Sequence, residues 1–124
     1  MQRLKTGTDQ IPAARLVDKT LVAEIDGEID LNTSPDLRTA LFDLIQQHAP
    51  ARLVLNLAKV PYMDSSALAV LIETLKLMRR SEGKVYLTDL QPHVRGLLEI
   101  ARLDAIFTVV DSEQAALEDG QLEK

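Results

Sequence analysis

The sequence predicts a single α/β domain built on a mixed, mostly parallel central sheet. Two observations lead to this prediction. Apolar segments of strand type and of helix type alternate along most of the chain, which is typical of parallel strands joined by crossover helices. The first two strand-like segments are instead separated by two residues only, which is the length of a hairpin turn. We therefore expect a sheet of four to five strands with about four helices.

The predicted hairpin lies near the start of the chain. Residues 20–26 carry apolar side chains at every second position, Leu21, Ala23 and Ile25, and this period of two predicts a half-buried strand. Residues 13–17 are a weaker strand candidate that precedes it. The polar residues 1–12 predict a flexible N-terminal segment.

A first helix is predicted to begin at Ser34 and to end before Ala49 and Pro50. Serine caps helices well, Pro35 is tolerated in the first turn, and Asp36 is favoured near the positive N-terminal end of a helix. The apolar residues that follow have helical spacing: Leu37, Ala40, Leu41, Leu44 and Ile45.

The middle of the chain predicts a covered parallel strand followed by a second helix. Residues 53–57 are apolar except for Asn56, to which we assign a hydrogen-bonded structural role. Asp64 or Ser65 is expected to cap the helix, whose apolar stripe comprises Leu68, Leu71, Ile72, Leu75 and Met78. The glycine at position 83 follows its basic C-terminal end.

The last third of the chain repeats the alternation. Residues 84–88 and 106–110 predict strands, and Pro92 opens a short helix between them. Asp111 and Gln114 have the spacing of a capping box and predict a final helix. The folded domain is accordingly expected over residues 13–118, with a tail at 119–124.

Composition excludes several classes of function. The chain of 124 residues has no cysteine, two histidines, no tryptophan and a formal net charge of −5. We expect no metal, no cofactor and no direct nucleic-acid partner, because cysteine ligands and a basic face are missing. The longest purely apolar run, residues 67–72, is too short to span a bilayer, and the start has no secretory h-region. A cytoplasmic location without membrane insertion is predicted.

The most informative segment is Val-Pro-Tyr-Met-Asp-Ser-Ser-Ala-Leu at residues 60–68. It connects a buried strand to a helix and therefore lies at the carboxyl edge of the sheet, where α/β proteins usually carry their sites. Asp64, Ser65 and Ser66 share the N-terminus of that helix, which favours a cap and also a negative group such as phosphate. The residues alone leave both interpretations open.

These residues carry a family resemblance. Asp-Ser-Ser-Ala-Leu at 64–68, preceded by Leu-Val-Leu-Asn-Leu at 53–57, resembles the core signature of STAS domains, and most closely that of bacterial anti-sigma-factor antagonists. Gly-Glu-Ile-Asp at 27–30 and Gly-Lys-Val at 83–85 resemble further segments of that family, as does the stretch from Leu97 to Phe107. The resemblance covers residues 16–117, and it implies a STAS-like α/β fold.

The resemblance implies a switch operated by phosphorylation. Its partners would be an anti-sigma factor that is also a GHKL-type serine kinase, and a PP2C-type phosphatase that resets the switch. Ser65 would accept the phosphate. The partner-binding residues would be Asp30, Asp64, Ser65, Ser66 and Ala67. Ala67 stands where the family usually has glycine.

The physical argument for such a switch concerns charge. A phosphoserine adds about −1.5 to −2 charges, which a helix N-terminus tolerates but a protein interface does not. We therefore expect phosphorylation to release the partner with only local structural change.

The alternatives are a STAS subunit of an ABC-type lipid transporter or a stressosome-like scaffold. A hydrolase using Asp64 and Ser65 is disfavoured, because neither histidine is clearly placed as a base and no G-x-S-x-G elbow occurs.

Overall fold

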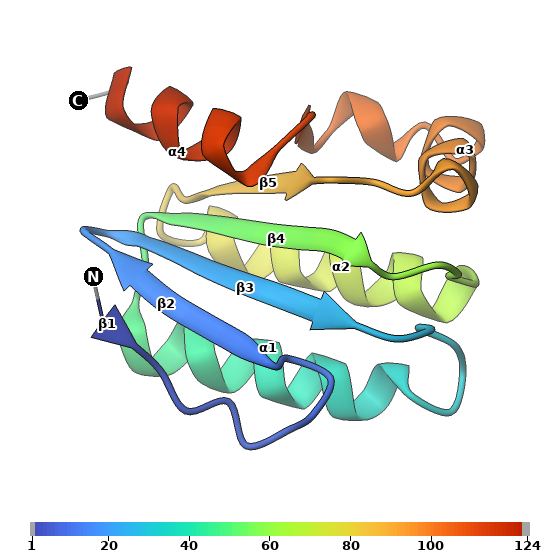
Figure 1. The fold of residues 1–124 in the computed structure, drawn as a ribbon, viewed down its shortest axis with the longest axis horizontal. Coiled ribbons are helices and arrows are strands. Elements are labelled where there is room, and N and C mark those ends of the chain that lie inside the picture. The colour runs from blue at the N-terminus through green and yellow to red at the C-terminus, as the bar shows by residue number, and fades with distance from the viewer. Residues whose placement is uncertain (1, 123–124) are drawn as a thin grey trace.

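The computed structural model describes residues 2–122, which form one six-stranded sheet in the order β1-β2-β3-β4-β5-β6 (Figure 1). The first three strands pair antiparallel, and β3 to β6 pair parallel. The strands are β1 Gln2–Arg3, β2 Ala13–Val17, β3 Thr20–Asp26, β4 Arg52–Lys59, β5 Lys84–Thr88 and β6 Thr108–Val110. The predicted mixed α/β class is confirmed, and the sheet has one strand more than the four to five expected.

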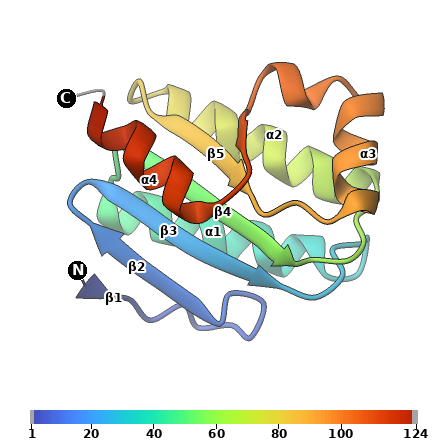
Figure 2. The same ribbon diagram turned by 45° about the horizontal axis from the view of Figure 1, so that its top comes forward.

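The helices cover the two faces of the sheet unequally (Figures 1 and 2). They are α1 Ser34–His48, α2 Ser65–Arg79, α3 Pro92–Ile100 and α4 Glu113–Leu122, with a 3₁₀ turn, η1, at Leu103–Ala105. The helices α1 and α2 pack side by side on one face, whereas α4 lies on the other face against β4, β5 and β6. Parallel strands need these crossovers, and the crossovers deliver the loops that follow β3 and β4 to one edge.

The core follows the alternation of side chains along the strands. Leu21, Ala23 and Ile25 of β3 are buried in the large cluster beneath α1 and α2. Val22, between them in sequence, joins a smaller cluster beneath α4 that also contains Val54, Tyr86 and Ala116. The period of two predicted for residues 20–26 is therefore confirmed on the side of the large cluster, whereas the other side is buried at Thr20 and Val22, half-buried at Glu24 and exposed at Asp26.

The segment expected to be flexible, residues 1–12, is joined to the sheet over its described part. Gln2 and Arg3 pair with β2, and the Leu4 amide donates to the Ala14 carbonyl over 2.8 Å. Ile11 is fully buried in the large core cluster. A strand of two residues is too short to leave a periodic signal, so the polar composition of the segment conceals it.

The first helix begins at Ser34 as predicted, but the capping residues of α1 and α4 differ from those expected. Ser34 is the buried first residue of α1, while the preceding Thr33 is the N-cap and turns its hydroxyl to the Glu28 carbonyl. At α4 the hydroxyl of Ser112, not the carboxylate of Asp111, accepts the Ala115 amide at 3.1 Å. In both cases the sequence offers two adjacent capping residues, and propensity does not distinguish between them.

The C-terminal part is more helical than expected. The helix α4 continues to Leu122, so it includes the first four residues of the predicted tail at 119–124, while residues 123–124 lie outside the described chain. The Tyr86 hydroxyl donates to the Asp119 carboxylate at 2.6 Å and ties this part of α4 to β5.

The last strand begins at Thr108 rather than at 106, because a 3₁₀ turn precedes it and Phe107 enters the core.

Candidate functional site

Two loops meet at the carboxyl edge of the parallel strands, to the right in Figure 1. They are the β3–α1 loop at residues 27–33 and the β4–α2 loop at residues 60–64. The Ile29 amide donates to the Tyr62 carbonyl at 3.1 Å, and the Asp64 amide donates to the Ile29 carbonyl at 3.2 Å. Backbone atoms therefore fix the two loops against each other, whatever side chains they carry.

Gly27 allows the first of these loops to turn. Its φ of 97° lies in the left-handed region that glycine enters without steric cost, and its amide donates to the Lys59 carbonyl at 2.9 Å. The parallel pairing of β3 and β4 resumes beyond this turn as a single bridge between Ile29 and Met63.

Asp64 is the side chain that joins the two loops. One carboxylate oxygen accepts the backbone amide of Ser66 at 2.9 Å and the Ser66 hydroxyl at 2.5 Å, which caps α2. The other oxygen accepts the amide of Leu31 at 3.1 Å. These donors, with the Ser66 hydroxyl first among them, lower the pKa of Asp64 against the opposing effect of desolvation, so the group is a carboxylate at neutral pH.

The two serines have different roles in this arrangement. The Ser66 hydroxyl is committed to Asp64, as described above. Ser65 is the first residue of α2, its side chain is exposed, and its hydroxyl makes no hydrogen bond within the described part of the chain. The structure therefore leaves one hydroxyl accessible at the start of the helix and holds the other in the cap.

Asp30 lies on the same edge but shapes its own loop. Its side chain accepts the amides of Asn32 at 2.9 Å and Thr33 at 3.1 Å, and its own amide donates to the Thr33 hydroxyl at 2.9 Å. This local turn leads directly into α1. Asp30 and Asp64 are linked only indirectly: Leu31, which follows Asp30 in the sequence, donates its amide to the Asp64 carboxylate.

Ala67 is not part of the exposed surface. Its side chain is 1% exposed and packs in the large core cluster, while its amide donates to the Asp64 carbonyl at 3.1 Å. Because the methyl group points inward, it does not stand between Ser65 and an approaching protein. The replacement of the family's usual glycine is accommodated by the core.

Three residues near the site have no role in the sequence-based interpretation. Leu31 is 75% exposed and Tyr62 is 41% exposed, although both are large apolar residues. The Tyr62 ring stacks on His93 of α3 with ring centroids 5.1 Å apart. Tyr62 belongs to the informative segment itself, but only the fold brings His93 to it from 31 positions further along the chain.

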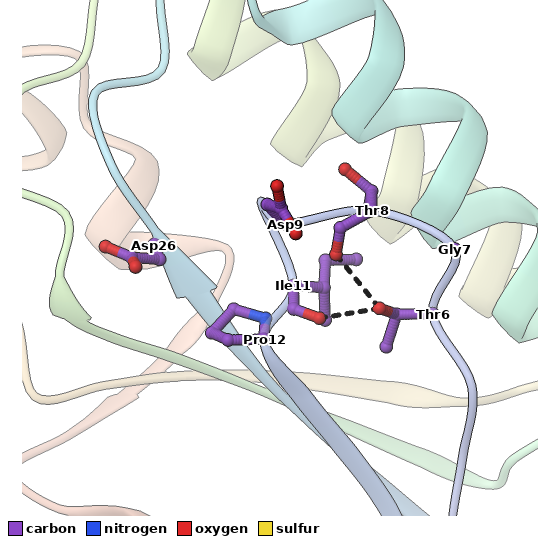
Figure 3. Close-up of a pocket in the computed structure, with 7 residues that line it drawn as sticks. All are labelled: Thr6, Gly7, Thr8, Asp9, Ile11, Pro12 and Asp26. Atoms are coloured by element: carbon purple, nitrogen blue, oxygen red, sulfur yellow. Dashed lines mark hydrogen bonds between the residues drawn. The ribbon is translucent and has the colours of Figure 1, made fainter.

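A separate polar recess of about 840 Å³ lies on the loop before β2 (Figure 3). Its lining includes the carboxylates of Asp9 and Asp26, and the Thr6 hydroxyl donates to the carbonyls of Thr8 and Ile11. None of the residues predicted for the functional site lines this recess.

Residues 2–122 form neither a metal-binding cluster nor a membrane-spanning helix. No group of three or more metal-ligating side chains of the histidine, cysteine, aspartate and glutamate types comes together in this range. No described helix combines the length and apolar character that a membrane span requires.

Known proteins resemble this chain in both sequence and fold. A family model described as the STAS domain matches residues 12–116, and the chain therefore belongs to the STAS domain family. The anti-sigma F factor antagonist of Paenibacillus polymyxa is 33% identical over 97 residues, which cover 78% of this chain and 83% of that protein. The crystal structure of an anti-sigma factor antagonist from Mycobacterium paratuberculosis aligns with a TM-score of 0.78 at 25% identity, over 86% of this chain and 89% of that one. The family of this chain is thus that of the anti-sigma factor antagonists.

Two further structures are similar in fold alone. The Bacillus cell fate determinant SpoIIAA in its phosphorylated form aligns with a TM-score of 0.66 at 20% identity, over 86% of this chain and 96% of that one. A sulfate transporter family protein from Wolinella succinogenes aligns with a TM-score of 0.74 at 19% identity, over 86% and 88%. The fold by itself therefore does not distinguish a regulator from a transporter component.

Proposed function

We propose that this chain binds an anti-sigma factor that is also a GHKL-type serine kinase, and that phosphorylation of Ser65 ends this binding. The observation that carries the proposal is the difference between the two serines. The exposed Ser65 hydroxyl is free to accept a phosphoryl group, whereas the Ser66 hydroxyl is already held by Asp64. The name of the Paenibacillus relative supports the partner class.

The chemistry assigns this chain the role of substrate. The Ser65 oxygen would attack the γ-phosphorus of ATP, the bond from that phosphorus to the bridging oxygen would break, and ADP would leave. The hydroxyl proton would pass to a base on the kinase. Within residues 2–122 the Ser65 hydroxyl makes no hydrogen bond to a base, and the neighbouring carboxylate, Asp64, is directed to Ser66 and Leu31, so Ser65 suits the role of a substrate better than that of a nucleophile.

The surroundings of Ser65 explain why a phosphate there would oppose binding. Residues 27–37 and 60–70 contain no lysine or arginine, while Glu28, Asp30, Asp36 and Asp64 are acidic. No cation of these two segments would neutralise the phosphate, although the N-terminus of α2 would tolerate it without unfolding. A partner covering this edge would have to desolvate a dianion to which these two segments offer no cation. A PP2C-type phosphatase would restore the binding form.

The test is affinity purification of the tagged chain from its native host, with mass spectrometry of the eluate and of the Ser65 peptide. The expected result is a small GHKL-type kinase together with partial phosphate on Ser65. The purified kinase should phosphorylate Ser66→Ala but not Ser65→Ala, a matched pair that differs by one position. Binding of Ser65→Asp should be weaker than that of the unmodified protein by about tenfold or more. A membrane ABC-type ATPase with no phosphate on Ser65 would instead establish the transporter subunit and refute the proposal.

A further inference from the structure

Asp64 occupies two of the donors at the start of α2 to which a phosphate on Ser65 would be drawn. Its carboxylate holds the Ser66 amide and the Ser66 hydroxyl, both in the first turn of α2. A helix N-terminus attracts an anion through these amide groups. A phosphoserine at position 65 would place a second anion one residue from the first, in competition for the same donors.

The second carboxylate oxygen of Asp64 links this competition to the other loop. It accepts the Leu31 amide at 3.1 Å, and Leu31 lies 33 positions earlier in the sequence. The Leu31 side chain is 75% exposed and projects from the turn that begins at Asp30. Any displacement or protonation of Asp64 therefore weakens a bond that positions an exposed apolar residue.

We propose that Asp64 transmits the phosphorylation state of Ser65 to the Leu31 turn, so that the phosphate loosens Leu31 as well as adding charge. This inference rests on the proposed function for the identity of the modified residue. The donors to Asp64 lower its pKa, so at neutral pH the competition is between two anions. The loosening stays local, because the Asp64 amide still binds the Ile29 carbonyl and the Ile29 amide still binds the Tyr62 carbonyl.

The experiment needs no kinase, because phosphoserine is incorporated at position 65 during translation of the full chain. Hydrogen exchange of individual amides is then followed by nuclear magnetic resonance. The Leu31 amide should exchange about tenfold faster than in the unmodified protein, as expected for the loss of one charge-assisted hydrogen bond. The Ile29 amide, held by a backbone carbonyl, should keep its rate.

Two variants make the result specific. Phosphoserine at position 81, an exposed residue just beyond the other end of α2, should leave Leu31 unchanged. Asp64→Asn should speed the exchange of Leu31 without any phosphate, because an amide NH₂ group cannot accept a second N–H. Phosphoserine at 65 should then add nothing further in the Asp64→Asn background.

Three results would overturn the inference: an unchanged Leu31 amide in the phosphoprotein, an equal change with phosphoserine at 81, or additive effects of Asp64→Asn and phosphoserine at 65. Failure of the proposed function is measured separately, by partner binding and by the modification state of Ser65 in the host. A chain that is never phosphorylated in the cell would still give a clear answer in the exchange experiment.

Discussion

Asn56 of β4 donates its side-chain amide to the carboxylate of Glu113 of α4 over 2.9 Å. The same carboxylate forms an ion pair with Arg15 of β2. One acidic side chain therefore connects the first turn of α4 to two strands of the sheet. The apolar cluster beneath α4 is small, and polar contacts through Glu113 and Asp119 also attach this helix to the sheet.

Removal of the Glu113 side chain should destabilise the protein. Glu113→Ala deletes two charge-assisted contacts and leaves the half-buried Asn56 amide without its acceptor, which should lower the free energy of unfolding by about 2 kcal/mol. Urea denaturation measures the change. The adjacent Gln114→Ala, at an exposed position of the same helix, should change stability by less than about 0.5 kcal/mol. Equal effects of the two substitutions would contradict this account of α4.

The contribution of Glu113 should also depend on pH. Burial raises the pKa of this carboxyl. Hydrogen bonds from Asn56 and Arg15 and the charge of Arg15 lower it by more, so the pKa lies below its usual value of 4.5. A depressed pKa in the folded state means that the stabilisation is complete above pH 4.5 and is lost as pH falls through the folded value. The stability difference between the unmodified protein and Glu113→Gln should therefore shrink steadily below that pH. A difference that is constant or grows in acid would disprove the assignment.

Alanine substitutions at two glycines should change the stability of the protein in opposite directions. A Cβ on Gly83 would lie 2.7 Å from the Met78 methyl carbon, and 3.0 and 3.2 Å from the backbone oxygens of Met78 and Ala51. Gly83→Ala should therefore destabilise the protein by about 1–3 kcal/mol. A Cβ on Gly96 in α3 would meet nothing within 4 Å, so Gly96→Ala should stabilise it by about 0.5–1 kcal/mol. Thermal unfolding of both variants decides whether the packing around residue 83 is as tight as described.

The stacked pair of Tyr62 and His93 should contribute to partner binding. Tyr62→Ala removes an exposed aromatic side chain from the β4–α2 loop and should weaken binding of the proposed kinase partner by about tenfold, whereas Tyr62→Phe keeps the ring and should retain the affinity. Ile106→Ala is the control, because Ile106 is also 41% exposed but precedes β6 at the amino edge of the parallel strands. Calorimetric titration measures the affinity of all three variants. If Ile106→Ala weakened binding as much as Tyr62→Ala, the partner would not bind specifically at the carboxyl edge.

The sequence predicts the fold well where periodicity is strong. The alternation in β3 and the helical period of α2 are visible in the residues themselves, because burial on a regular element imposes its period on the sequence. The centre of the buried side of α2 is nevertheless shifted from the predicted stripe: Leu68 and Ile72 are only half-buried, whereas Ala67, Val70 and Thr74 are buried. The strand β1 is missed because two residues carry no period. The location of Ser65 at the start of α2 is likewise predicted by Asp64 and the apolar stripe that follows.

The division of roles within the site is not predictable in this way. Which serine binds Asp64, the inward direction of the Ala67 methyl group, and the contact between Asp64 and Leu31 all depend on how two loops from distant parts of the chain come together. Local propensity gives Asp64, Ser65 and Ser66 equal claims as capping residues. Only the three-dimensional arrangement distinguishes the residue that caps from the residue that remains accessible.

The junction of the two loops through main-chain atoms has an evolutionary consequence. Bonds such as that from the Ile29 amide to the Tyr62 carbonyl do not depend on the identity of either side chain. Substitutions at exposed positions such as Leu31 can therefore change the surface of this edge while Ser65 keeps its place at the start of α2. After gene duplication, copies of such a chain can diverge at these positions and recognise different partners, while the backbone junction of the two loops stays the same.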